Sequence, residues 1–137
     1  ILGITMNIRE ILYMFLISIP LINGIANIML ANNICDVEED IKNKRFTLPY
    51  YIGEKTALKV FEILYYIGYV DIILLILLKI LPFKLFLMLI TLIPVRKNIK
   101  VFQNKPSKSE TFVISVKNFV LMNVCYIILL GISIFMK

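Results

Sequence analysis

The stretch VFEILYYIGYVDIILLILL, residues 60–78, is apolar or aromatic at nearly every position and carries only two charged side chains, Glu62 and Asp71. A helix of this length rises roughly 28 Å, which is close to the thickness of the hydrocarbon core of a bilayer. Apolar runs of about 18 residues or more are typical of membrane-spanning helices. The stretch therefore predicts a transmembrane helix.

The rest of the chain has the same character. Its 137 residues are 60% hydrophobic with a mean hydropathy of +0.88, whereas ordinary soluble domains are about 45–50% apolar. Three further apolar runs accompany the first one. Together they predict an all-α, polytopic transmembrane helical bundle of about four spans, at residues 11–31, 60–78, 81–95 and 119–136.

Lysine and arginine are distributed unevenly around this predicted bundle. Eleven of the 15 fall in two loops, residues 32–59 and 96–117, which four spans place on the same side. Cytoplasmic loops carry such an excess, so both loops are expected in the cytoplasm and the protein in the cell membrane. The net charge of +6 also raises the question of nucleic acid, but the cations lie between apolar runs and form no nucleic-acid motif. No nucleic-acid partner is therefore expected.

The first span has one polar face. Asn23 and Asn27 are four residues apart, and Pro20 and Gly24 lie on the same side of the predicted helix. Small residues let membrane helices approach closely, and amide side chains find partners across an interface. This face is expected to line the interior of the bundle or a cavity. In the second span, Asp71 is expected to face a partner or a watery cavity, because a carboxylate is costly in lipid.

Acidic and basic residues follow the first span directly. Asp36 and Asp40 are four residues apart, so both carboxylates project from one face if the helix continues through them. Such a pair can hold Mg²⁺, which prefers a few carboxylates together with waters and phosphate oxygens. Lys42 and Arg45, just downstream, can donate to diphosphate oxygens. The alternative is a solvated loop whose mixed charges only mark the membrane boundary.

Other metal and catalytic chemistries have little support. The chain has no histidine, and its two cysteines, Cys35 and Cys125, have no metal-ligand spacing. Zinc sites and histidine-based catalysis are therefore not expected.

The order of residues around the two acids resembles a known motif. The second aspartate-rich motif of the UbiA-type intramembrane aromatic prenyltransferases is similar to the run Asn32-Asn33-x-x-Asp36-x-x-x-Asp40, followed by Thr47-Leu48-Pro49 and Gly53. The doubled asparagine and the Thr-Leu-Pro continuation most resemble the branch that prenylates 1,4-dihydroxy-2-naphthoate in menaquinone biosynthesis. Two positions depart from the usual pattern: Cys35, where members often have arginine, and Lys44, where they often have glycine.

The resemblance implies a place in a nine-span helical architecture. In that family the second motif lies between the sixth and seventh spans, so this chain is expected to correspond to the last four of nine. The first aspartate-rich motif of the family is absent from the sequence. An N-terminal half or a homo-oligomer is therefore an expected partner. The alternative is a non-catalytic truncated remnant or a small membrane interaction subunit.

The resemblance also implies a reaction. Members of the family transfer a polyprenyl group from polyprenyl diphosphate to an aromatic acceptor, with Mg²⁺ as cofactor. Asp36 and Asp40 are accordingly the expected catalytic residues and metal ligands. The residues expected to bind the diphosphate substrate are Asn32, Asn33, Lys42 and Arg45.

Overall fold

The computed structural model describes residues 7–135, and all of its regular structure is helical in that range. The end of the fourth predicted span, at Met136, lies outside the described residues. In chain order the elements are α1 (Ile8–Cys35), α2 (Val37–Lys42), α3 (Leu48–Ile52), α4 (Glu54–Leu77), the 3-10 helix η1 (Phe83–Thr91), α5 (Leu92–Asn104), α6 (Val113–Phe119), the π-helix η2 (Val120–Val124) and α7 (Cys125–Phe135).

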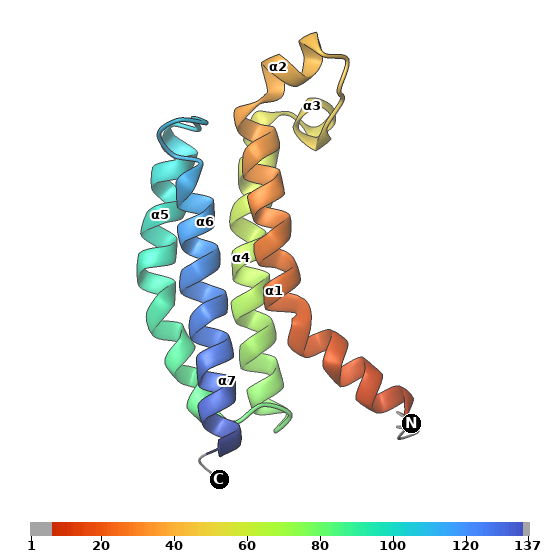
Figure 1. Ribbon diagram of the computed structural model, residues 1–137, viewed down its shortest axis with the longest axis vertical. Coiled ribbons are helices and arrows are strands. Elements are labelled where there is room, and N and C mark those ends of the chain that lie inside the picture. Colours follow the sequence, from red (N-terminus) through yellow and green to blue (C-terminus); the bar gives the residue numbers. More distant parts are fainter. Residues whose placement is uncertain (1–6, 136–137) are drawn as a thin grey trace.

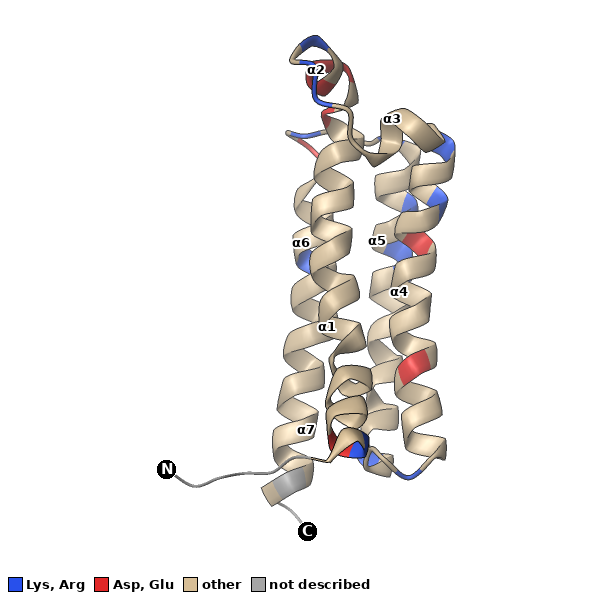
Figure 2. Cartoon of the chain, turned by 90° about the vertical axis from the view of Figure 1, so that its right-hand side faces the viewer, with Lys and Arg blue, Asp and Glu red and all other residues tan. Residues whose placement is uncertain are grey.

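Four helical rods run alternately up and down (Figure 1). They are α1, α4, the continuous pair η1–α5 and the continuous series α6–η2–α7. The short helices α2 and α3 and the connection 105–112 meet at one end of the bundle, which we call the motif end. The turn at 78–82 and the end of α7 lie at the other. Most charged residues gather toward the motif end, whereas the middle of the bundle is almost free of charge (Figure 2).

Within residues 7–135, three helical segments are long and apolar enough to cross a membrane: Ile8–Cys35, Glu54–Leu77 and Val113–Ser133. They indicate a membrane-embedded helical protein, as the composition predicted. A further span, which the sequence predicted at residues 81–95, is not confirmed. Its residues divide between η1 and the first turn of α5, and α5 then continues through the cations Arg96, Lys97 and Lys100.

The helices extend beyond the apolar runs that predicted them. The predicted loop at 32–59 is largely helical, because it contains α2, α3 and the first turns of α4. The predicted loop at 96–117 shrinks to residues 105–112, since α5 ends at Asn104 and α6 begins at Val113. Lysine, arginine and glutamate are good helix formers. The charged positions therefore mark where the surroundings of a helix become polar, and not where the helix ends.

Helix α1 bends at Pro20, and its N-terminal half leaves the bundle (Figure 1). Proline has no backbone N–H and cannot complete the ladder of helical hydrogen bonds, which causes a kink. At the bend, the buried Tyr126 hydroxyl donates to the Ile17 carbonyl at 3.0 Å. The predicted polar face of α1 begins at the bend: Pro20, Gly24 and Asn27 are buried, as the sequence predicted, whereas Asn23 is half-buried.

Aromatic side chains pack the rod α4 against the rod η1–α5. Phe61 of α4 packs against Phe102 of α5, with ring centroids 4.8 Å apart, and against Tyr65 at 5.2 Å. All three side chains are almost completely buried. Nearby, the Gln103 amide of α5 donates to the Glu62 carboxylate at 2.9 Å and to the Leu58 carbonyl at 3.2 Å. These contacts fix α5 beside α4 and thereby fix where the connection 105–112 begins.

Candidate functional site

A cluster of Asn32, Asp36 and Lys108 lies at the motif end. The Asn32 amide donates to the Asp36 carboxylate at 3.1 Å. The Lys108 ammonium donates to the same carboxylate oxygen at 2.6 Å and also contacts the Asn32 side-chain oxygen. Lys108 is 72 residues away in sequence from Asp36. The fold therefore completes the predicted motif with a cation from a distant segment.

The connection that carries Lys108 is held by its own hydrogen bonds. The Ser107 N–H donates to the Thr111 hydroxyl at 2.8 Å, and that hydroxyl donates to the Lys105 carbonyl at 2.7 Å. The Lys105 ammonium pairs with Glu110 at 2.7 Å. The Lys108 ammonium lies 5.1 Å from the centroid of the Phe112 ring, within the range of a cation–π interaction. The segment is thus folded so that Lys108 faces α1.

The second predicted metal ligand, Asp40, has a different environment. Only 4% of this residue is exposed. Its carboxylate accepts a hydrogen bond from the Thr47 hydroxyl at 3.3 Å and lies 3.5 Å from the Arg45 guanidinium. The backbone N–H of Arg45 also donates to the backbone carbonyl of Asp40 at 2.7 Å. In this structure Asp40 closes the loop between α2 and α3.

The two carboxylates have separate partners. Helix α1 ends at Cys35, Asp36 has φ −106° and ψ 9°, and α2 begins at Val37. The Asp40 N–H still donates to the Asp36 carbonyl at 2.8 Å, so the four-residue relation predicted from the sequence persists across the break. However, one carboxylate pairs with Lys108 and the other with Arg45 and Thr47.

Two residues with positive φ shape the segment between α2 and α4. Gly53 has φ 77° and ψ 151°, a conformation that is essentially restricted to glycine, and it separates α3 from α4. Lys44 has φ 56°, in the left-handed region where glycine is the default residue. These two backbone positions turn the chain back over the motif end.

Two hollows flank the cluster. One, of about 630 Å³, is lined by both acids and bases, among them Asp36, Glu38, Glu54, Lys42 and Lys108. The predicted diphosphate contact Lys42 thus shares a hollow with Asp36.

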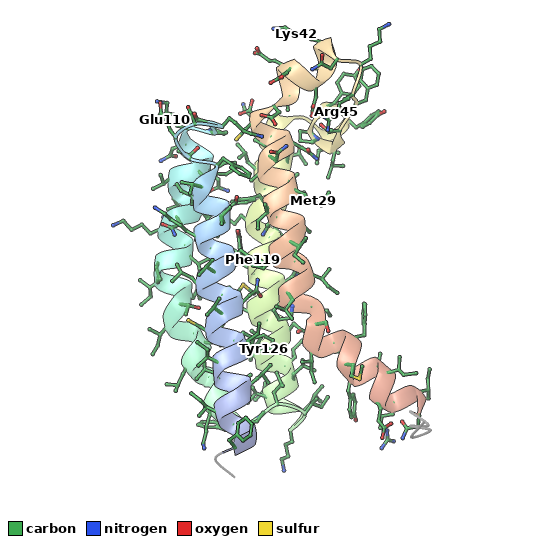
Figure 3. All side chains as sticks on the ribbon, in the orientation of Figure 1. Met29, Lys42, Arg45, Glu110, Phe119 and Tyr126 are labelled. Atoms are coloured by element: carbon green, nitrogen blue, oxygen red, sulfur yellow. The ribbon has the colours of Figure 1, made fainter. Side chains whose placement is uncertain are left out.

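The second hollow, of about 310 Å³, is lined by Asn32, Asn33, Arg45 and Phe112, among others. Five of the predicted site residues are therefore divided between two hollows, and the sixth, Asp40, lines neither. Figure 3 shows Lys42 and Arg45 on the α2–α3 segment and Glu110 on the connection beside it.

The residues present fit a magnesium ion that is held mainly through its substrate. Within residues 7–135, no group of three or more His, Cys, Asp or Glu side chains is arranged to hold a metal. Asp36 is the motif carboxylate that faces a hollow, with 19% of its side chain exposed. Magnesium sites built on one or two carboxylates take their remaining ligands from substrate phosphates and water. Of the two predicted ligands, Asp36 is thus the more accessible, although it also pairs with Lys108, and Asp40 is buried beside Arg45 and Thr47.

Sequence reasoning missed Lys108, and it could only have placed this residue in a basic loop. The spacing in α1 predicted that Asn27 faces the interior, but nothing in the sequence indicated that α6–η2 would contribute buried amides as well. Asn27, Asn118 and Asn123 are at most 1% exposed, and each has an amide atom without a hydrogen-bond partner. In α4, one Asp71 carboxylate oxygen is also buried without a partner. These groups lie in the rods and not at the motif end.

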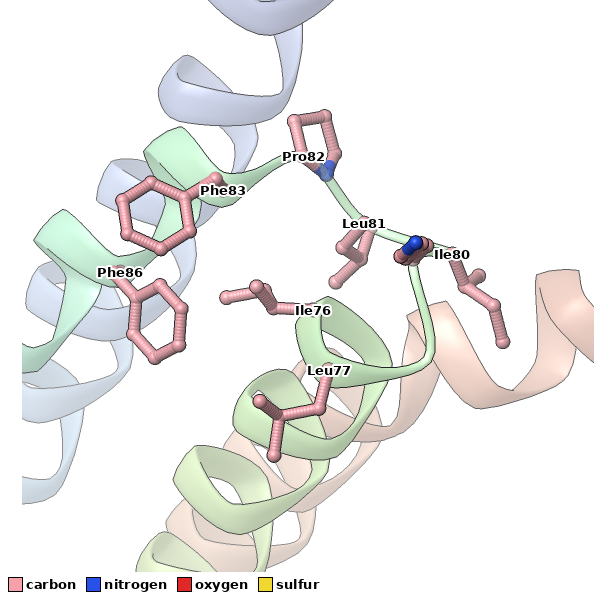
Figure 4. A pocket seen from close by; sticks show the side chains of 8 residues that line it. Ile76, Leu77, Ile80, Leu81, Pro82, Phe83 and Phe86 are labelled. Carbon is pink, nitrogen blue, oxygen red and sulfur yellow. The ribbon is translucent and has the colours of Figure 1, made fainter.

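A larger hollow, of about 720 Å³, lies at the opposite end of the bundle (Figure 4). It is lined mainly by apolar side chains of the 78–82 turn and its neighbours, including Ile76, Leu77, Phe83 and Phe86. No residue of the predicted motif lines it. It is therefore separate from the candidate site.

The fold and the cluster describe a membrane-embedded helical protein with a mixed-charge site at one end of its bundle. Comparison with family models, with curated proteins and with solved structures finds no match to this chain. The functional argument therefore depends on the residues of the site and on the resemblance of their order.

Proposed function

We propose that this chain is part of an intramembrane prenyltransferase that transfers a polyprenyl group from polyprenyl diphosphate to an aromatic acceptor, 1,4-dihydroxy-2-naphthoate in menaquinone biosynthesis. The observation that carries the proposal is the cluster of Asn32, Asp36 and Lys108 at the motif end. It combines an acid for a metal ion with a cation for a diphosphate. It also lies where the apolar helices end, so a bound lipid diphosphate would keep its chain in the membrane.

Two backbone observations support the resemblance on which the acceptor is based. Gly53, part of the motif, adopts a conformation that requires glycine. Lys44, where family members often have glycine, adopts the left-handed conformation that glycine takes most readily. The chain therefore turns at the two positions where the family pattern has glycine. We place the motif end on the cytoplasmic side of the cell membrane, because most cations lie there.

The acidic and basic residues of the site would have different roles. Asp36 would hold Mg²⁺, which when bound supplies positive charge to stabilise the departing diphosphate. Lys108, together with Lys42 and Arg45, would donate to the diphosphate oxygens. The carbon–oxygen bond of the donor breaks to leave an allylic cation, which the aromatic ring attacks before losing its proton. The apolar helices keep water away from that cation.

One acidic site is not sufficient for the reaction that the resemblance implies. The first aspartate-rich motif has no counterpart in the sequence, and Asp40 is engaged by Arg45 and Thr47. We therefore propose that an N-terminal half carrying the first motif, or a second copy of this chain, completes the site. The competing function is a non-catalytic membrane subunit or remnant.

The test is prenylation of 1,4-dihydroxy-2-naphthoate in membranes that contain the chain alone or together with a segment carrying the first motif, each with Mg²⁺ or with a chelator. Transfer that appears only with the added segment and Mg²⁺ supports the proposal that the site needs both motifs. Transfer by the chain alone supports a homo-oligomeric site. Absence of prenyl transfer in every condition, with the chain folded in the membrane, favours the non-catalytic subunit and contradicts the proposal.

Replacing Lys108 by glutamine is expected to raise the KM for polyprenyl diphosphate about tenfold or more. The reason is the loss of a charged hydrogen-bond donor, which contributes about 1.5–3 kcal/mol in such contacts. Lys105→Gln is the matched control, because Lys105 lies on the same connection and pairs with the exposed Glu110. Steady-state kinetics with both variants would measure the difference. An unchanged KM in Lys108→Gln would mean that Lys108 only stabilises the fold.

A further inference from the structure

The Lys108 ammonium lies where two oxygen atoms of the candidate site converge. One is the Asp36 carboxylate oxygen, 2.6 Å away, and the other is the Asn32 side-chain oxygen. The Asn32 amide nitrogen donates to the same Asp36 oxygen at 3.1 Å, which holds the two side chains together. Carboxylate and amide oxygens are also the ligands that hard divalent cations take from proteins. A cation of the chain itself therefore contacts the groups that the site would offer to Mg²⁺.

The Lys108 side chain can leave Asp36 without a change in the helices. The connection that carries it is held by hydrogen bonds at the Thr111 hydroxyl, which do not involve the Lys108 side chain. That side chain is 49% exposed, and its ammonium is carried on a flexible four-carbon stem. The ammonium also lies 5.1 Å from the centroid of the Phe112 ring, a contact that does not depend on Asp36. Partly exposed ion pairs contribute little to stability, so the exchange of partners costs little.

The hollow beside this ion pair has an excess of acid. Four acidic and two basic side chains line it, which leaves two negative charges: Asp36, Glu38, Glu39, Glu54, Lys42 and Lys108. A diphosphate alone would be repelled by this excess, and a divalent cation alone would meet the Lys108 ammonium at Asp36. A divalent cation together with a diphosphate avoids both costs, because the metal offsets the acids and the diphosphate oxygens accept from Lys108. The charges of the hollow therefore favour the two ions together over either ion alone.

We propose that Lys108 competes with the metal ion for Asp36, so that a divalent cation binds there tightly only together with a diphosphate. The inference rests on the proposed function, because it takes Asp36 as the metal ligand. Lys108 turns from Asp36 to a diphosphate oxygen as the substrate enters, which leaves the Asp36 carboxylate to the metal. Lys108 returns to Asp36 when the diphosphate leaves, which lowers the affinity for the metal. Lys108 thus couples metal binding to the presence of the diphosphate.

The affinity of the full chain for Mn²⁺ is measured by electron paramagnetic resonance in detergent micelles, without any diphosphate. Mn²⁺ takes the same oxygen ligands as Mg²⁺ and is directly detectable. We expect Lys108→Met to bind Mn²⁺ about tenfold more tightly than the wild-type chain, because the variant lacks the competing charged donor. Lys108→Arg should bind as weakly as the wild-type chain, since it keeps the charge. Equal affinity of Lys108→Met and the wild-type chain overturns the proposal.

Two further variants show which groups are responsible. Lys42→Met removes a cation from the same hollow, whereas the ion pair of Asp36 is with Lys108. We expect it to tighten Mn²⁺ binding about twofold or less, because its charge is not at the Asp36 carboxylate. Asp36→Asn added to Lys108→Met should abolish the gain. An equal gain in Lys42→Met, or a gain that persists without the Asp36 carboxylate, overturns the proposal. Circular dichroism in the same micelles checks that the variants remain helical.

A second measurement separates this inference from the proposed function. Retention of radiolabelled inorganic pyrophosphate by the wild-type chain is measured with Mg²⁺ and with a chelator. We expect retention only with Mg²⁺, and equal retention in both conditions overturns the coupling. No retention with Mg²⁺ contradicts the proposed function at this site, and this inference with it. Retention that requires Mg²⁺, without a gain of Mn²⁺ affinity in Lys108→Met, overturns this inference alone.

Discussion

Replacement of Asp36 by asparagine is expected to reduce Mg²⁺-dependent prenyl transfer about 10²–10³-fold, which is the usual cost of removing one group that stabilises charge in a transition state. Asparagine has nearly the same shape but removes the negative charge that pairs with Lys108 at 2.6 Å and that would hold the metal. Transfer is measured in membranes where the segment carrying the first motif is also present. The loss should appear in kcat, since the charge develops during the reaction.

Glu39→Gln is the matched control for that experiment. Glu39 lines the same hollow as Asp36, and its substitution removes the same charge, but Glu39 occupies a variable position of the motif, and Lys108 pairs with Asp36 instead. We expect it to keep most of the activity. Stability should change little in either variant, because partly exposed ion pairs contribute about 0–1 kcal/mol. Full activity in Asp36→Asn, or an equal loss in Glu39→Gln, would exclude a specific metal site at Asp36.

Hydropathy predicted where the long helices lie but not where they end. The run at 60–78 lies in α4 except for its last residue, Leu78, yet α4 begins earlier, at Glu54, directly after Gly53. Apolar character can be read from a short stretch of sequence, so the position of a long apolar helix can be predicted without knowledge of the fold. A helix end is decided by a few dihedral angles, such as φ 77° at Gly53, and charged residues do not impose one.

In the candidate site, only the contacts between residues close together in the sequence could be predicted. Asn32 lies in the last turn of α1 and Asp36 directly follows the helix, four residues later, so their hydrogen bond follows from helical spacing. Lys108 reaches them only because α5 is fixed against α4 and the 105–112 connection then turns toward α1. The burial of Asp40 likewise depends on how Thr47 and Arg45 close their loop. Such contacts require the positions of whole helices, which one sequence does not give.

Replacement of Gly24 by valine is expected to lower the free energy of unfolding by about 1–3 kcal/mol, the usual cost of overpacking. An ideal Cβ at Gly24 would lie 2.4 Å from the Asn123 amide nitrogen and 2.8 Å from the Phe119 ring. Both distances are below van der Waals contact. Asn123 is 1% exposed and belongs to η2, so it has little room to move away. Helix α1 must therefore shift away from the α6–η2 segment.

The matched control is Gly131→Val, since a Cβ at Gly131 would have no neighbour within 4 Å. We expect its stability to be unchanged or slightly higher, because glycine is a poor helix former. Unfolding is followed by circular dichroism during titration with sodium dodecyl sulfate in mixed micelles. Since Gly24 is about two turns before Asn32 on α1, the shift should also separate Asn32 and Asp36 from Lys108 and reduce prenyl transfer. Equal stability of the two variants would mean that α1 and η2 do not approach closely at Gly24.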